Sequence, residues 1–339
     1  MDKRIDKLLE LLVVWVLLTS VLGLTAALAG YFLAPQVFLL SLLLTGCYEW
    51  WTRAGKSPSG RPIDWRHLAV LLLIGLFFRV PAYNCVLGGQ DEGVYVNMAH
   101  YIARTGEIAV RDDSLQKLQG TRYVATYLSD NRLDANQFMP GVYVDGKDGV
   151  RLQFQFYHLF PVWMALAVGI FGGASGVWAL TLFALISILF FYRLALEISK
   201  SPRVAMVAGI LLAVCPLHAF FSKFPVTEVP TLAFSLIGFT YLAMYHNASV
   251  ADRRRRWLWI SCAAFAMLFV TRISGFMYMP FVIAIAFASM VADEDRKRSR
   301  AVMIWAVATA ILYLVSVWYG LKWSGHYSKD IYRTSFDPI

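Results

Sequence analysis

The sequence predicts an all-α polytopic membrane protein with about nine transmembrane helices. Hydrophobic residues make up 58% of the 339 and charged residues only 16%, which is more apolar material than a soluble domain hides in one core. A helix that crosses a bilayer needs ~20 mainly apolar residues. Nine stretches meet or approach this length: residues 8–29, 33–51, 67–87, 177–197, 203–221, 229–246, 257–273, 276–291 and 301–320.

The positions of the basic residues predict the orientation of these helices. A net charge of +9 also occurs in nucleic-acid-binding proteins, but here the basic residues lie in short connections between apolar stretches, as the positive-inside rule describes. We therefore expect a cytoplasmic N-terminus, an outer C-terminus and no nucleic-acid partner. The basic connections contain Lys56, Arg61 and Arg66, then Lys200 and Arg203, then Arg253 to Arg256, and then Arg296, Lys297, Arg298 and Arg300.

Two apolar stretches can be interpreted in more than one way. The end of residues 8–29 resembles a signal-peptide cleavage site, but the run is long for a signal peptide, so we interpret it as a retained span. A tenth stretch, residues 156–172, would place residues 253–256 outside if it crossed the membrane. We therefore expect it to be a juxtamembrane or re-entrant helix on the outer side.

The chain divides into two N-terminal helices (residues 1–58) and a transmembrane core (residues 59–339), which includes a large outer loop (residues 88–176). In this loop the apolar spacing between Val94 and Ile102 predicts an amphipathic helix that ends near Thr105-Gly106. Alternation in residues 150–156, after a Gly-containing turn, predicts a small β-hairpin with residues 142–144.

Several segments together resemble one family. The run DEGVYVNMAHYIARTG resembles the first outer loop of GT-C glycosyltransferases, which include protein O-mannosyltransferases and the aminoarabinose transferase that acts on lipid A. HLFPVWMALAVGIFGG, CPLHAFFSKFPVTEVP and TRISGFMYMP are similar to later family segments, in the same order and on the same side. The resemblance covers about residues 67–290, with Phe160-Pro161 in place of the family's usual Pro-Pro pair and Lys223 in place of its usual Arg.

The resemblance implies an inverting glycosyltransferase. Such an enzyme moves a sugar from a polyprenyl-phosphate carrier to an acceptor on the outer face of the membrane. The acceptor can be a protein, a lipid or another glycan. Because the lipid phosphate leaves as an anion, the protein must mainly deprotonate the acceptor hydroxyl and stabilise phosphate charge.

The resemblance makes Asp91 the candidate general base. The alternative is that Asp91 only caps the helix that begins beside it. Glu92 does not share its face of the helix, so we expect it to contact the acceptor or a metal, or simply to be solvated.

Glu228 lies at an outer membrane boundary, where a carboxylate in hydrocarbon is costly. It is either a functional residue or a solvated helix-start residue. Together with Asp91 it offers oxygen ligands that suit a divalent cation such as magnesium or manganese.

Arg272 and Lys223 are outer-side cations. An Arg fork suits phosphate, and we assign both residues to substrate binding, although each can also reach lipid headgroups.

Two histidines, His158 and His218, are either proton-transfer or substrate-binding groups or hydrogen-bonded structural residues. The run Asp293-Glu294-Asp295 resembles the metal-binding Asp-x-Asp motif of soluble glycosyltransferases, but in a short cytoplasmic loop we interpret it as a solvated turn. No nucleotide-binding glycine loop occurs.

The main alternative function is a non-catalytic GT-C-like membrane subunit or lipid-binding scaffold. A partner subunit is compatible with both functions. A transporter is a third interpretation, but the chain lacks the internal repeats typical of that class.

Overall fold

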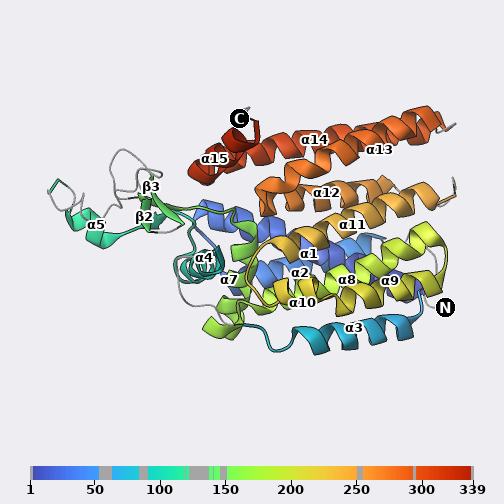
Figure 1. Cartoon of the computed structure of the whole chain (residues 1–339), viewed down its shortest axis with the longest axis horizontal. Helices are drawn as coiled ribbons and strands as arrows, with labels where there is room; N and C mark the ends of the chain where they lie inside the picture. The colour runs from blue at the N-terminus through green and yellow to red at the C-terminus, as the bar shows by residue number, and fades with distance from the viewer. Residues whose placement is uncertain are drawn as a thin grey trace.

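In the computed structural model, long helices run side by side, and a small sheet stands at one end of the bundle (Figure 1). The structure describes residues 3–52, 63–83, 91–118, 120–121, 137–139, 141–145, 151–249, 255–292 and 295–336. The first helices are α1 (Lys3–Ala29), α2 (Ala34–Thr52), α3 (Trp65–Arg79), α4 (Asp91–Thr105) and α5 (Asp113–Leu118). After the strands come α7 (Leu159–Phe171), η1 (Gly173–Ser175), α8 (Trp178–Ser199), α9 (Pro202–Val214), α10 (Pro216–Phe221), α11 (Glu228–Asn247), α12 (Arg255–Thr271), η2 (Ile273–Tyr278), α13 (Met279–Ala292), α14 (Arg296–Trp323) and α15 (Gly325–Phe336).

Each of the nine predicted spans contains a described helix, although α3 ends at Arg79 within the predicted span 67–87, and nine spans are not shown. Four helical segments in the described part of the chain are long and apolar enough to cross a membrane, namely Arg4–Ala29, Gly173–Ser199, Ile273–Val291 and Arg296–Trp323. The remaining predicted spans form shorter or less apolar helices, and the stretch 203–221 is broken by Pro216 into α9 and α10. A proline lacks the amide proton that a continuous helix requires.

The buried Arg79 forms hydrogen bonds with backbone and side-chain groups at this break. Its guanidinium donates to the carbonyl oxygens of Ala213 at 2.9 Å and of Gly75 at 3.0 Å, and to Nδ1 of His218 at 2.5 Å. Carbonyls near the end of a helix lack intrahelical partners, so Arg79 joins α3 to the end of α9.

The ambiguous stretch forms α7, which at 13 residues is about 20 Å long and too short to cross a bilayer. It packs against α1, α2, α4 and α8. Trp163 of α7 donates its indole proton to Ser20 of α1 at 2.9 Å. The N-terminal helices therefore pack directly on the element that supports the outer loop.

The predicted hairpin is present and belongs to a larger sheet. Strands β3 (Val142–Asp145) and β4 (Arg151–Phe154) pair antiparallel, with Tyr143 opposite Gln153. The short strands β1 (Val110–Arg111) and β2 (Gln137–Met139) extend them into a four-stranded sheet of order β1-β4-β3-β2. The turn of the hairpin, residues 146–150, lies outside the described residues, as does the Asp293-Glu294 pair.

An ionic cluster ties the helices together at the end of the bundle that carries the N-terminus. Arg193 of α8, only 2% exposed, lies 3.4 Å from Asp6 of α1 and 2.8 Å from Glu197. Glu10 of α1 pairs with Arg256 of α12 at 3.2 Å. We call these residues, Asp6, Glu10, Arg193, Glu197 and Arg256, the inner cluster.

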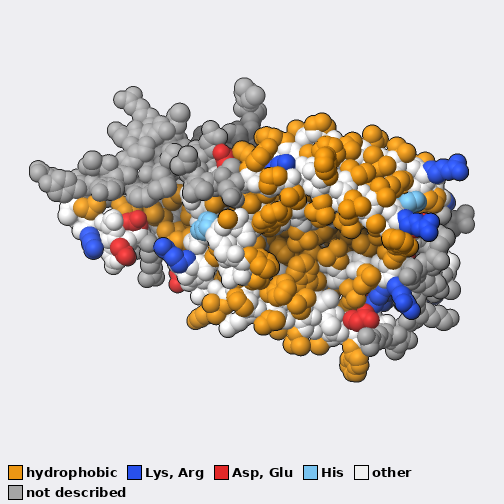
Figure 2. Space-filling model, turned by 90° about the horizontal axis from the view of Figure 1, so that it is seen from below, with side chains coloured by type: hydrophobic (Ala, Val, Ile, Leu, Met, Phe, Trp, Pro, Cys, Tyr) orange, Lys and Arg blue, Asp and Glu red, His pale blue; other side chains and the backbone are white. Residues whose placement is uncertain are grey.

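The surface agrees with a protein embedded in lipid. Figure 2 shows hydrophobic side chains over most of one face of the helices, with Lys and Arg mainly toward its two ends. Large apolar side chains such as Phe77, Phe287 and Val291 are 67% exposed or more. Monomeric soluble proteins rarely expose such continuous apolar surface, and the chain is an integral membrane protein.

Candidate active site

Asp91 is the first residue of α4, the predicted amphipathic helix. A carboxylate suits this position because the helix dipole is positive there. The helix ends at Gly106, whose φ of +77° is unfavourable for residues with a side chain. Its buried face, which includes Val94, Met98 and Ile102, packs on α7. The outer loop therefore holds Asp91 on a supported helix.

Glu228 and Arg272 form an ion pair, although 44 positions separate them in the sequence. Nη1 of Arg272 lies 2.5 Å from Oε1 of Glu228, and both side chains are about one-third exposed, at 35% and 36%. Glu228 is the first residue of α11, and Arg272 lies between α12 and η2. Arg272 also donates from Nε to Ser274 at 2.9 Å and from Nη1 to Thr227 at 3.3 Å. These contacts hold the guanidinium plane in one orientation.

Asp91 lies within electrostatic reach of this pair. Partial burial raises the pKa of its carboxyl, the negative charges of Glu228 and Glu92 raise it further, and Arg272 lowers it. The structure thus brings three predicted site residues, Asp91, Glu228 and Arg272, into one cluster built from α4, α11 and the end of α12. We call them the outer cluster.

Tyr95 connects α4 to the ion pair. It lies one turn after Asp91, is 6% exposed and shares a side-chain hydrogen bond with Thr227, which also binds Arg272. Burial raises the pKa of the Tyr95 hydroxyl, so the group stays protonated at neutral pH. Its ring stacks on Phe156 with centroids 4.7 Å apart.

Tyr327 of α15 forms a further wall of the site. Its ring meets Phe156 edge-on at 5.2 Å. Burial raises the pKa of its hydroxyl, Arg272 lowers it, and Asp91 and Glu228 raise it, so the hydroxyl lies within electrostatic reach of the three charges. α15 is docked on the sheet, where His326 stacks on Tyr143 at 4.8 Å and Gly325 donates its amide proton to Gln153 at 3.2 Å.

The other predicted site residues occupy different surroundings. Glu92 is half-buried beside Asp91. Nζ of Lys223 lies 5.5 Å from the centre of the Tyr83 ring, a cation–π contact. His218 accepts from Arg79, because a guanidinium only donates. The assignment of Glu92 and Lys223 to substrate stays a prediction.

His158 is fully buried at the start of α7 and lies against α14. Its Nδ1 is 2.7 Å from the hydroxyl of Tyr319, and burial lowers the pKa of the imidazole to about 3. The ring is therefore neutral at physiological pH and helps to hold α7 against α14. Its contact with substrate stays a prediction.

The outer cluster offers a metal two carboxylates, from Asp91 and Glu228. Within the described residues no group of three or more His, Cys, Asp or Glu side chains surrounds a possible metal position. A cation at Glu228 would also have to compete with Arg272 for the carboxylate. The donor set therefore fits a metal poorly unless a substrate phosphate supplies further oxygens.

The sequence resembles a known protein family over part of its length. Residues 157–320 match the family model described as dolichyl-phosphate-mannose-protein mannosyltransferase. Over this segment the sequence is similar to that family. Its members are GT-C membrane glycosyltransferases. No curated protein and no solved structure gives a match.

The family match includes Glu228 and Arg272 and begins only at residue 157, after Asp91. The link between Asp91 and the other two residues therefore comes from the geometry. Sequence reasoning missed Tyr95, Thr227 and Tyr327. A signal existed for Tyr95, because positions i and i+4 share a helix face, and for Thr227, which adjoins Glu228. Tyr327 follows the last predicted span, and no local pattern marks it.

Proposed function

We propose that the chain transfers mannose from a polyprenyl-phosphate carrier to an acceptor on the outer face of the membrane, with inversion at the anomeric carbon. The convergence of Asp91, Glu228 and Arg272 from three separate helices supports this proposal most strongly. The family description supports the mannosyl group and the polyprenyl-phosphate donor.

Asp91 acts as the general base in this mechanism. Its carboxylate takes the proton of the acceptor hydroxyl while that oxygen forms a bond to the anomeric carbon. The bond between this carbon and the phosphate oxygen breaks at the same time, and the electron pair leaves with the lipid phosphate. Attack from the face opposite the phosphate inverts the configuration. The raised pKa of Asp91 makes its carboxylate a stronger base than an ordinary Asp.

Arg272 stabilises the charge on the leaving phosphate. Its contacts with Glu228, Thr227 and Ser274 use Nε and Nη1, and we assign Nη2 to a phosphate oxygen. Glu228 then acts as a positioning residue that holds the guanidinium in place before the donor arrives. Such preorganisation avoids a reorganisation cost during the reaction.

The arrangement of the helices suits an outer active site. The described starts of α12 and α14 and the N-terminus lie at one end of the bundle, whereas α4, the sheet and α15 lie at the other (Figure 1). Under the positive-inside rule the first end faces the cytoplasm, so the outer cluster faces away from it. The carrier lipid enters sideways between the helices.

A divalent cation is a secondary part of the proposal. Asp91 and Glu228 would hold it together with the donor phosphate, and its chemistry would be charge neutralisation. Treatment with EDTA should then lower transfer, and magnesium or manganese should restore it. Transfer that is unchanged by EDTA would exclude this part while leaving the roles of Asp91 and Arg272 intact.

The decisive experiment replaces Asp91 by Asn. Asn has nearly the same size and shape as Asp, so this change keeps the packing but removes the basicity. We expect transfer of radiolabelled mannose from polyprenyl-phosphate-mannose into acceptors of a membrane extract to fall roughly 10²- to 10⁴-fold. The control is Asp113→Asn, at the exposed start of α5 in the same outer loop, which should leave the rate unchanged.

Transfer at the parental rate by purified Asp91→Asn protein would show that the proposed base is wrong. The non-catalytic scaffold makes a different prediction. It is favoured if no variant or parental protein transfers sugar and if Asp91→Ala lowers the thermal stability, because the residue would then be only a helix cap.

A further inference from the structure

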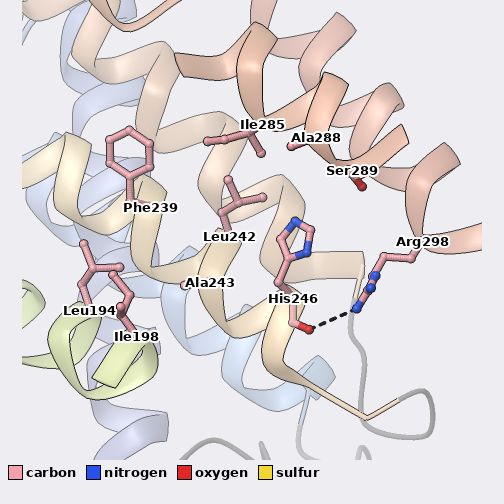
Figure 3. Close-up of a pocket in the computed structure, with 10 residues that line it drawn as sticks. All are labelled: Leu194, Ile198, Phe239, Leu242, Ala243, His246, Ile285, Ala288, Ser289 and Arg298. Atoms are coloured by element: carbon pink, nitrogen blue, oxygen red, sulfur yellow. Dashed lines mark hydrogen bonds between the residues drawn. The ribbon is translucent and has the colours of Figure 1, made fainter. Parts of the chain in front are cut away.

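Two hollows lie at the inner end of the bundle, which carries the N-terminus, and they differ in their charges. The first, of about 470 Å³, lies between α8, α11, α13 and the start of α14. Figure 3 shows Arg298 beside His246, whose carbonyl oxygen accepts a hydrogen bond from the guanidinium at 3.4 Å. The basic group of this hollow is thus already engaged by the protein.

The second hollow, of about 530 Å³, is a groove between the first turns of α12 and α14. Both helices begin at this end and pack side by side. Three cations line the groove: Arg255 from α12, and Lys297 and Arg300 from α14. The 17 residues of α12 separate it from Arg272 by about 25 Å, so the groove is distinct from the outer cluster.

The three cations have no ionic partner among the residues that the structure describes. The interaction of a cation with a helix N-terminus is also unfavourable, because the helix dipole is positive there. The positive-inside rule explains why basic residues occupy these connections. This rule does not explain why three of these cations line one groove. Binding of an anionic ligand would explain it.

The rest of the groove is apolar. Leu258, Trp259 and Ile304 line it, and Trp259 is 55% exposed and Ile304 49% exposed. Trp305 also lines it and is 1% exposed, and its indole N–H has no hydrogen-bond acceptor in the described part of the chain. The groove thus combines a cationic mouth, apolar walls and one unused donor.

We propose that the groove between the starts of α12 and α14 binds an anionic phospholipid. The phosphate lies among Arg255, Lys297 and Arg300, and the upper part of an acyl chain lies along Leu258, Trp259 and Ile304. An ester oxygen of the lipid would supply the acceptor that the Trp305 indole lacks. Basic pockets between membrane helices on the cytoplasmic side are a recognised setting for anionic headgroups. The inference does not depend on the glycosyltransferase reaction.

The test measures lipid binding to the full-length protein in detergent. Phosphatidylglycerol and phosphatidylcholine are titrated separately, and native mass spectrometry counts the retained lipid molecules. We expect the parental protein to retain phosphatidylglycerol at a concentration about tenfold lower, or less, than the concentration of phosphatidylcholine that it needs for the same retention. Each cation near an anionic headgroup adds to the attraction. In Arg255→Gln/Lys297→Gln/Arg300→Gln protein this preference should disappear.

Two further variants control for charge and folding. Arg66→Gln/Lys200→Gln/Arg203→Gln protein loses the same charge from other connections and should keep the preference. Arg255→Lys/Arg300→Lys protein keeps the charge of the groove and should also keep it. Trp259→Ala should weaken the binding of both lipids alike, because it removes only apolar contact.

Four outcomes would overturn the proposal. The glutamine triple variant could keep the preference for phosphatidylglycerol, or the matched control could lose it, and either result would place the site elsewhere. Glycerol phosphate alone could raise the Tm of the parental protein as much as the lipid does, which would show a soluble-anion site. Masses of a dimer that disappear in the triple variant would instead identify the groove as a contact between two copies of the chain.

Discussion

The inner and outer clusters both join charged residues from separate helices, but they differ in burial. In the inner cluster Arg193 is 2% exposed, and Asp6 and Glu197 take up its charge at 3.4 and 2.8 Å. In the outer cluster Glu228 and Arg272 are about one-third exposed, and Asp91 lies nearby without a close ionic contact to any residue that the structure describes. The inner cluster is closed to substrates, whereas the outer cluster is open to them.

This difference separates a structural role from a chemical one. Breaking a buried pair leaves an uncompensated charge in the interior, which is strongly destabilising. A partly exposed pair contributes little to stability, so the outer cluster must be explained by what it binds. Four changes test this contrast, and they follow from the largest expected effect to the smallest.

Arg193→Met removes the cation of the inner cluster. Because Asp6 and Glu197 then share a buried site without the Arg193 cation, we expect the free energy of unfolding to fall by about 3–5 kcal/mol. Thermal unfolding of purified protein in detergent measures this change. The control is Glu49→Gln, which breaks a more exposed contact with Lys7 and should cost less than about 1 kcal/mol. Equal losses in both variants would contradict a special role for burial.

Arg272→Gln removes the cation of the outer cluster. We expect kcat of the proposed transfer to fall about 10²- to 10³-fold, because the guanidinium stabilises charge that develops in the transition state. Thermal stability should change by less than about 1 kcal/mol. A steady-state assay with varied donor concentration separates kcat from KM. A rise in KM with an unchanged kcat would assign Arg272 to ground-state binding alone.

Gly320→Ala tests the packing that closes the outer end. A methyl group on Gly320 of α14 would overlap the hydroxyl of Tyr157, so we expect a loss of about 1–3 kcal/mol in the free energy of unfolding. Gly46→Ala in α2 is the control, since no atom lies within 4 Å of the added methyl group. Its expected effect is neutral or slightly stabilising. Tolerance of Gly320→Ala would mean that α7 and α14 are more loosely packed at this point.

Glu228→Gln should move the pH dependence of transfer. Catalysis requires ionised Asp91, so activity is present above its pKa and is lost as the pH falls through it. The negative charge of Glu228 raises this pKa, and its removal therefore moves the acidic limb to lower pH. Arg272→Gln should move the same limb to higher pH. A limb that stays fixed in both variants would separate Asp91 from the titration that controls the rate.

The sequence predicted the parts of the structure that depend on local pattern. Apolar periodicity marked α4, and alternation around a glycine turn marked the β3–β4 hairpin. Asp91, Glu228 and Arg272 were proposed as companions because they share one side of the membrane, and the structure brings them together. Their chemical roles stay predictions.

Local sequence patterns do not predict contacts between residues that are distant in the sequence. Spans 203–221 and 276–291 contain interruptions, at Pro216 and in η2. At the first of them Arg79, which is distant in the sequence, donates to a carbonyl oxygen of α9. Strands β1 and β2 are two and three residues long, too short for a pattern to appear. Tyr327 reaches the site only because α15 docks on the sheet through Gln153 and Tyr143.

The position of α15 has a consequence for biosynthesis. Helices enter the membrane in chain order, and Asp91, Glu228 and Arg272 have all been made before ribosomes reach Tyr327. On the proposed mechanism, a nascent chain that ends within α14 carries its base and its phosphate-binding cation in a site that lacks one wall. Activity then depends on synthesis that has passed α15, because this helix must emerge and dock to complete the site.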